Sequence, residues 1–68
     1  MHMQMVRVNS SAIEAVGYSA ETQRMKITFK QGHTYDFCRV PQHVFDGLMR
    51  AASTGAYYND HIKDRYQC

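Results

Sequence analysis

The clearest hydrophobic pattern is a strict alternation between residues 24 and 30. The apolar residues Met25, Ile27 and Phe29 alternate with the polar residues Arg24, Lys26, Thr28 and Lys30. Successive side chains of a β-strand point to opposite faces of its sheet, so this alternation predicts a strand with one buried face. The four polar residues are therefore expected to face solvent.

Two earlier segments also have the character of strands. Residues 6–8 alternate and predict a short edge strand, and residues 12–18 predict a longer one. The alternation in the longer segment is imperfect, because Ile13 and Val16 have opposite parity. We expect a bulge or a close backbone approach at Gly17, since an isolated glycine within a strand is typical of both.

The loop before the next strand, residues 33–40, decides which aromatic side chains face the core. A two-residue loop of Gln31 and Gly32 would place Tyr35 and Phe37 on the basic, solvent-facing side. A loop of residues 30–32 instead pairs alternate residues: Phe29 with His33, Ile27 with Tyr35 and Met25 with Phe37. Such loops commonly end in a left-handed residue, which suits Gly32. We therefore predict the longer loop, with Tyr35 and Phe37 on the core face.

The second half of the chain has a helical pattern. Apolar residues recur at spacings of three and four from Val44 to Ala52, which predicts an amphipathic helix lying across the sheet. Pro41 is expected in its first turn, where a missing N–H group costs nothing. Gly55 is expected to end this helix as a left-handed cap.

A second, shorter helix is expected from a cap at Asn59 to about Asp64, with Ile62 inward and Lys63 outward. Together these elements predict an α+β fold. It consists of a small antiparallel meander of three to four strands, followed by one main helix and a short C-terminal helix. Residues 1–5 have no periodicity and are expected to be disordered, and residues 6–68 are expected to form one domain.

Composition agrees with a small globular domain. The chain has 68 residues, 44% of them hydrophobic, and a formal net charge of +2. No apolar run approaches the roughly 18 residues that cross a membrane, and we recognise no secretory signal. We therefore expect a cytoplasmic protein without membrane partners. The charge is too small to identify a partner by itself.

Metal-ligating and nucleophilic side chains lack the spacing of a reactive site. The ligand types present are His33, Cys38, His43, His61 and Cys68. No Cys-x-x-Cys motif and no histidine pair on one helix face occurs, so we expect no metal and no cofactor. With only two cysteines and no secretory signal, we expect reduced thiols rather than a disulfide.

Catalysis has one candidate. Cys38 would need His43 or the nearby helix start to lower its pKa, whereas a thiol late in a strand is typically a small apolar filler. Paired carboxylates and glycine-rich phosphate loops are absent, so we predict that the protein is not an enzyme.

Cations and aromatic residues indicate a binding surface instead. Cations on one strand face, interleaved elsewhere with tyrosines, are typical of proteins that bind RNA or another single-stranded nucleic acid. The candidate residues are Arg24, Lys26, Lys30, Tyr57, Tyr58, Lys63 and Arg65. Solvated strand lysines and tyrosines at the rim of a core are the structural alternative. The functional alternative is a protein-interaction module that uses a sheet edge or the helix side around His43, Asp46 and Arg50.

An ordered set of short motifs resembles the KTSC domain over residues 7–66. The set comprises Gly17-Tyr18, Phe29, Gly32, Tyr35-Asp36-Phe37, Val40-Pro41, Val44-Phe45, Gly47-Leu48, Ala52-Ser53, Gly55, Tyr57-Tyr58-Asn59 and Ile62-Lys63. This family is named for a C-terminal extension of some lysyl-tRNA synthetases and also includes small stand-alone proteins. The resemblance implies RNA binding by association. The family's central Tyr-x-Tyr is Tyr35-Asp36-Phe37 in this chain, so one hydroxyl is missing.

Overall fold

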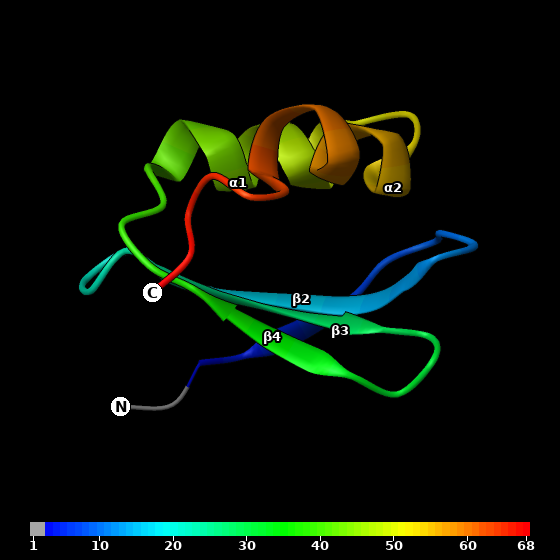
Figure 1. Cartoon of the computed structure of the whole chain (residues 1–68), viewed down its shortest axis with the longest axis horizontal. Helices are drawn as coiled ribbons and strands as arrows, with labels where there is room; N and C mark the ends of the chain where they lie inside the picture. Colours follow the sequence, from blue (N-terminus) through cyan, green and yellow to red (C-terminus); the bar gives the residue numbers. More distant parts are fainter. Residues whose placement is uncertain (1–2) are drawn as a thin grey trace.

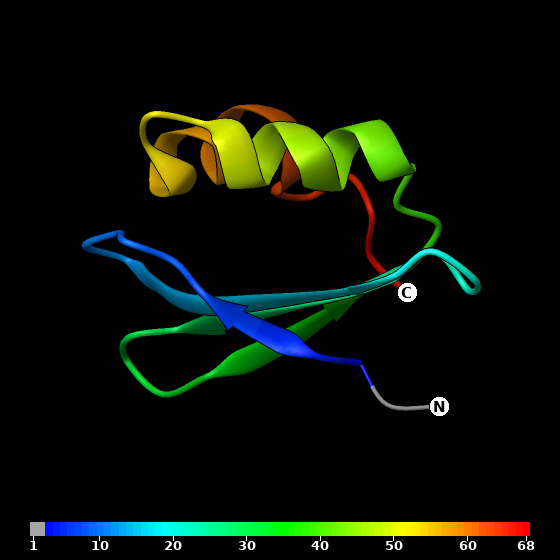
Figure 2. The same cartoon turned by 180° about the vertical axis from the view of Figure 1, so that it is seen from behind.

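Four strands form an antiparallel meander in the order β1-β2-β3-β4, with all helices on one of its faces (Figure 1). The computed structural model describes residues 3–68. The strands are β1 (Met5–Arg7), β2 (Ile13–Ser19), β3 (Arg24–Phe29) and β4 (Thr34–Phe37). In the view from behind, no element of the described part of the chain covers the opposite face of the sheet (Figure 2). This arrangement confirms the predicted α+β meander.

A β-bulge explains the imperfect alternation of β2. The pairing with β3 shifts between Ile13 and Ala15, so one extra residue is accommodated there. Ile13 and Val16 therefore both face the core, where each is fully buried. The bulge lies at this shift rather than at Gly17. The space at Gly17 is filled by a side chain rather than by another backbone, because a Cβ atom there would lie 2.9 Å from Cγ of Met3.

The β3–β4 hairpin has the predicted register. Ile27 pairs with Tyr35 and Met25 with Phe37, and Gly32 has a φ of +106°. The expectation of two core aromatics is only half right. Phe37 is 4% exposed, but Tyr35 is 47% exposed. β4 is one of the two edge strands of the sheet, which accounts for the exposure of Tyr35.

The helical half contains α1 (Gln42–Arg50), α2 (Thr54–Tyr57) and a π-helical turn, η1 (Tyr58–Ile62). Two predicted caps are wrong. Gly55 lies within α2 instead of ending α1, because the chain leaves α1 through extended Ala51. Asn59 lies inside η1, and Ser53 caps α2 by accepting a hydrogen bond from the Ala56 N–H.

Pro41 has a helical φ of −64° but an extended ψ of 150°, so it is the N-cap of α1 rather than its first residue. The helices and the inner face of the sheet enclose one hydrophobic core. Its buried members are Ile13, Val16, Met25, Ile27, Phe37, Val40, Val44, Leu48 and Ile62. As predicted, Ile62 points inward and Lys63 is exposed.

A disulfide between Cys38 and Cys68 overturns the expectation of reduced thiols. The C-terminal segment returns to the end of β4, where Phe37 bridges to Gln67. The Cys38 N–H also donates to the carbonyl of Tyr66 over 2.8 Å. These contacts bring the two Cα atoms to 5.0 Å across a separation of 30 residues. The pairing depends on tertiary contacts, which the local pattern around either cysteine does not reveal.

Among residues 3–68, no helix combines the length and apolar character that a membrane crossing requires. Strand β1 begins at Met5, one residue before the predicted edge strand. The expectation for residues 1–5 includes Met1 and His2, which lie outside the described residues.

Candidate nucleic-acid interface

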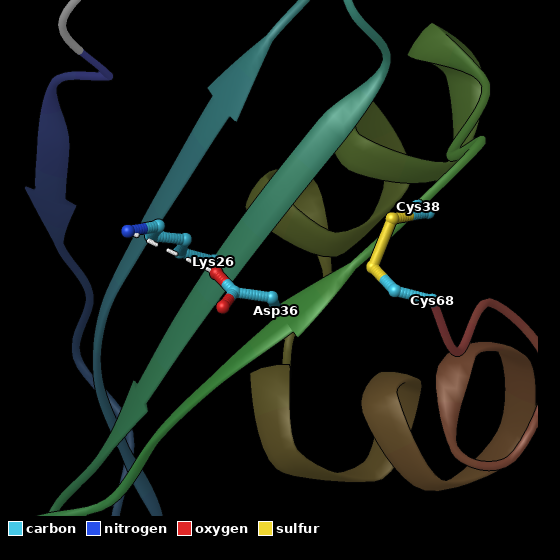
Figure 3. Close-up of a disulfide and its surroundings, with 4 residues drawn as sticks. All are labelled: Lys26, Asp36, Cys38 and Cys68. Atoms are coloured by element: carbon cyan, nitrogen blue, oxygen red, sulfur yellow. Dashed lines mark ion pairs between the residues drawn. A yellow bond between two sulfur atoms is a disulfide. The ribbon is translucent and has the colours of Figure 1, made fainter.

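The strand cations lie on the face of the sheet that points away from the helices. Met25 and Ile27 fill the core, so the alternate residues Arg24 and Lys26 point to the open side, and both are exposed. Lys26 is partly neutralised, because its Nζ atom lies 3.8 Å from Oδ1 of Asp36 on β4. Figure 3 shows this pair in front of the sheet, with the helices behind it.

Arg24 is the first residue of β3, and Lys30 directly follows its last residue, Phe29. At about 3.3 Å per residue, the Cα atoms of these two residues lie about 20 Å apart. Arg24 lines an open hollow beside the disulfide, together with Thr22, Arg39 and Gln67. Lys30 begins the turn between β3 and β4. Arg24 and Lys26 therefore lie in a row on the open face, and Lys30 lies beyond them in the turn, so the three cations do not form one compact cluster.

Aromatic rings gather near the Lys30 end of the sheet. The Phe29 ring contacts Tyr35 edge to face, with centroids 5.5 Å apart, and contacts Tyr58 in the same manner at 5.2 Å. The His33 ring lies 6.2 Å from that of Tyr35. We call Phe29, His33, Tyr35 and Tyr58 the aromatic cluster. It joins β3 and β4 to the start of η1 and leaves the Tyr35 ring accessible.

Tyr58 connects this cluster to the core. Its ring also contacts Phe37 edge to face at 6.0 Å, and it is half-buried. Burial raises the pKa of the Tyr58 phenol above its ordinary value, and the carboxylate of Asp64 and the phenol of Tyr35 raise that pKa further. The Tyr58 hydroxyl is therefore neutral at physiological pH and can take part in hydrogen bonding.

Tyr57 packs against other helical residues rather than in the aromatic cluster. Its hydroxyl lies directly against Gly47 of α1, where a Cβ atom would have no room. The centroids of the Tyr57 and His61 rings are 4.4 Å apart. The half-buried Tyr57 ring thus packs between helical elements.

The predicted residues do not form one continuous patch. Arg24 and Lys26 lie on the open face of the sheet, whereas Tyr57 and Tyr58 pack on its helical side. Lys63 and Arg65 are exposed on the segment after η1, which descends from the helices towards the disulfide (Figure 1). The structure places Lys30 and Tyr58 at the same end of the molecule, because both adjoin Phe29.

The surface position of Tyr35 was not predicted from the sequence pattern. Its parity correctly assigns it to the inner face, but parity says nothing about how far the helices extend. The available signal was its position near the hairpin turn on the last strand of a meander, where one flank has no neighbouring strand. Within residues 3–68, no cluster of three or more histidine, cysteine or acidic side chains is arranged to hold a metal ion.

Comparison with known proteins connects this geometry to a family. A protein of Tsukamurella paurometabola is 45% identical over 60 residues, which cover 88% of this chain and 90% of that protein. A lysine–tRNA ligase of Nostoc punctiforme is 30% identical over 63 residues, which cover 93% of this chain but 11% of the ligase. The crystal structure of a KTSC domain protein from Yersinia pestis superposes with a TM-score of 0.95 at 31% identity, covering 98% of this chain and 94% of that one.

The family model that matches is that of the KTSC domain, and it spans residues 9–66. This span includes all four members of the aromatic cluster and every strand cation considered above. It also agrees with the sequence resemblance over residues 7–66. The chain therefore belongs to the KTSC domain family.

Proposed function

We propose that this domain is a non-catalytic module that binds single-stranded RNA at the hairpin end of its sheet. The observation that carries the proposal is the accessible ring of Tyr35, 47% exposed and supported edge-on by Phe29. Sequence-specific RNA recognition uses unpaired bases, which stack on aromatic side chains. A ring that is held by a neighbouring ring and stays about half exposed can accept a base without a costly rearrangement.

The proposed base contacts use Tyr35 first, with His33 and Tyr58 beside it. His33 is exposed and lies next to Tyr35 in space, so a second base can continue the stack. Tyr58, the first residue of η1, adds a hydroxyl that can form a hydrogen bond with a base. Because aromatic stacking tolerates every base, this part of the site supplies affinity rather than sequence preference.

The proposed phosphate contacts come from the row of strand cations. Lys30 lies nearest to the aromatic cluster, and Lys26 and Arg24 continue along the open face. Lys26 forms an ion pair with Asp36, so it should contribute less to phosphate binding than Lys30 does. Tyr57, Lys63 and Arg65 stay secondary candidates. Tyr57 packs against Gly47 and His61, and the two cations lie on the segment that runs from η1 towards the disulfide.

The relatives supply context. The matching lysine–tRNA ligases act on tRNA, as their name states, and they contain a segment similar to almost the whole of this chain. We extend that context to this protein only as part of the proposal. Within the proposal, the site of action is the cytoplasm, where most thiols are reduced and the Cys38–Cys68 bond would be an exception.

A titration of fluorescently labelled single-stranded RNA and tRNA at two salt concentrations tests the proposal. For a single strand, the logarithm of the association constant should fall by about 0.7 per phosphate contact for each tenfold rise in salt concentration. Tyr35→Ala should weaken binding about fivefold or more, as expected from the loss of one stacked base. Absence of binding by the wild-type protein at low salt would refute the proposal.

A matched pair of charge variants locates the contact. Lys30→Ala and Arg50→Ala each remove one exposed cation, but Arg50 lies in α1 on the helical side. Lys30→Ala should reduce the salt slope by about 0.7, while Arg50→Ala should leave it unchanged. Equal effects of the two variants would indicate attraction by net charge alone.

One observation favours a protein partner as the second candidate function. Edge strand β1 exposes the apolar side chains of Met5 and Val6, at 38% and 43%. An exposed edge strand can pair with an extended segment of another chain. A partner that survives nuclease treatment and is lost in Val6→Lys would support this function over RNA binding.

A further inference from the structure

A second feature of the hairpin end is a hollow between the sheet and α2. The connection from β1 to β2 passes below α2 at this end of the molecule (Figure 1). The hollow has a volume of about 380 Å³, and its lining includes Ser11, Phe29, Ser53, Tyr58 and Asn59. That volume lies within the range of sites that bind small ligands, about 300–1,000 Å³.

Aromatic carbon and hydrogen-bonding groups both line this hollow. Phe29 and Tyr58 contribute rings that already contact each other, with centroids 5.2 Å apart. Among the described residues, the side chains of Asn59 and Ser11 form no hydrogen bond with another residue. Ser53 accepts from the Ala56 N–H, which leaves its own hydroxyl proton available. The hollow therefore offers both donors and acceptors next to flat apolar surfaces.

This combination suits a flat heteroaromatic ring whose edge carries donors and acceptors. An Asn carboxamide presents one acceptor and one donor side by side, which is the pattern found on the edges of nucleobases. Lys30 lies close by, because its backbone N–H donates to the carbonyl of Ala12, a residue of the hollow, over 2.9 Å. Its cationic side chain is exposed and can contact a phosphate near the rim.

We propose that this hollow binds one unpaired nucleobase, packed against the joined rings of Phe29 and Tyr58 and selected by hydrogen bonds to Asn59. The inference rests on the proposed RNA binding and deepens it. Tyr35 and His33 give stacking without base selection, whereas the hollow adds a position at which one base is preferred. Asn59 and Tyr58 belong to the π-helical turn η1, and such turns occur frequently at functional sites.

Gly55 provides a way to close the hollow without touching its aromatic walls. A Cβ atom at Gly55 would lie 3.6 Å from Cβ of Ala12, which is an ordinary contact. Gly55→Ala should therefore fold normally and leave most of the space open. Gly55→Leu would extend a branched side chain from the same position into the hollow.

The test compares these two variants in titrations with a set of short single-stranded RNAs that differ at one base. Ala20→Leu serves as control, because Ala20 is exposed in the turn at the other end of the sheet. The wild type, Gly55→Ala and Ala20→Leu should bind alike and prefer one base. Gly55→Leu should weaken binding about fivefold or more and lose the preference.

A second variant keeps the test decisive if Gly55→Leu fails to fold. Asn59→Ala removes the carboxamide without filling the hollow, and Asn59 is exposed, so folding should be maintained. It should reduce the base preference, and added nucleoside monophosphates should shift the NMR signals of Tyr58 and Asn59 in the wild type.

The two proposals fail in distinguishable ways. If the wild type binds RNA but Gly55→Leu and Asn59→Ala match it in affinity and base preference, the base-binding hollow is refuted and the RNA module stands. If the wild type binds no RNA, the proposed function itself is refuted.

Discussion

The phenol hydroxyl of Tyr18 donates a hydrogen bond of 2.6 Å to the backbone carbonyl of Val40. This bond spans 22 residues and ties the end of β2 to the connection between β4 and α1. The ring of Tyr18 also stacks on Phe45 of α1, with centroids 4.8 Å apart. One side chain thus holds the sheet and the first helix in position.

Tyr18→Phe should therefore destabilise the domain. The variant keeps the stacked ring but leaves the Val40 carbonyl without this donor, which costs about 1–2 kcal/mol. Urea denaturation checks the loss. Tyr35→Phe is the control, because the exposed Tyr35 hydroxyl donates no hydrogen bond to another described residue. The urea midpoint of Tyr35→Phe should match that of the wild type.

Alkaline pH should weaken the fold through two tyrosines. Burial raises the pKa of Tyr18, with a further contribution from the Asp46 carboxylate, and burial likewise raises the pKa of Tyr58. The unfolded chain then loses these phenol protons first as the pH passes about 10. The stabilisation from both groups is complete below that pH and declines above it.

Thermal melts from about pH 9 to about pH 11 measure this decline. Tyr58→Phe cannot ionise at this position, so its melting temperature should fall less steeply with pH than that of the wild type. Parallel curves for the two proteins would contradict the assignment of alkaline sensitivity to Tyr58.

Reduction of the disulfide should destabilise the domain strongly. The bond closes a loop with a sequence separation of 30, which corresponds to about 3–4 kcal/mol in the chain-entropy account. Melts with and without a dithiol reductant measure the difference. A Cys38→Ser/Cys68→Ser double variant should melt near the reduced wild type and be insensitive to the reductant. An unchanged wild-type melting temperature on full reduction would count against the assigned bond.

Two helical glycines should respond to alanine in opposite directions. Alanine usually stabilises a helix by about 1 kcal/mol relative to glycine. Gly55→Ala has room for its methyl group, so it should be neutral or stabilising. Gly47→Ala would push the Tyr57 ring out of its place on α1 and should be destabilising. Melting temperatures that move together would show that this packing contact is unimportant.

Local patterns predicted the sheet well, because its determinants lie close in sequence. Gly32 indicated the loop length, and the loop length determined the register of β3 and β4. The opposite parities of Ile13 and Val16 signalled a bulge, although not its exact position. Such features depend on backbone geometry within a few residues.

The remaining features depend on contacts between distant segments. Cys68 meets Cys38 only because the C-terminal segment returns to β4. Ser53, rather than Asn59, caps the second helix because the chain leaves α1 early, at Arg50. The exposure of Tyr35 depends on where the helices end above an edge strand.

The Tyr-x-Tyr motif of the resemblance illustrates the same limit. Parity alone could not show that its two aromatic positions have different environments. Phe37, the position without a hydroxyl, is buried against Tyr58, whereas Tyr35 retains its hydroxyl at the surface. The change at Phe37 therefore leaves the proposed contact surface intact.

NMR mapping of a single-stranded RNA onto the isotope-labelled protein shows whether RNA binds at the hairpin end of the sheet. The amide signals of residues 29–35 and 58–59 should shift on titration, and those around Lys26 should shift more weakly. Shifts confined to α1 or to the exposed edge of β1, or no shifts at low salt, would contradict the proposed binding at the hairpin end.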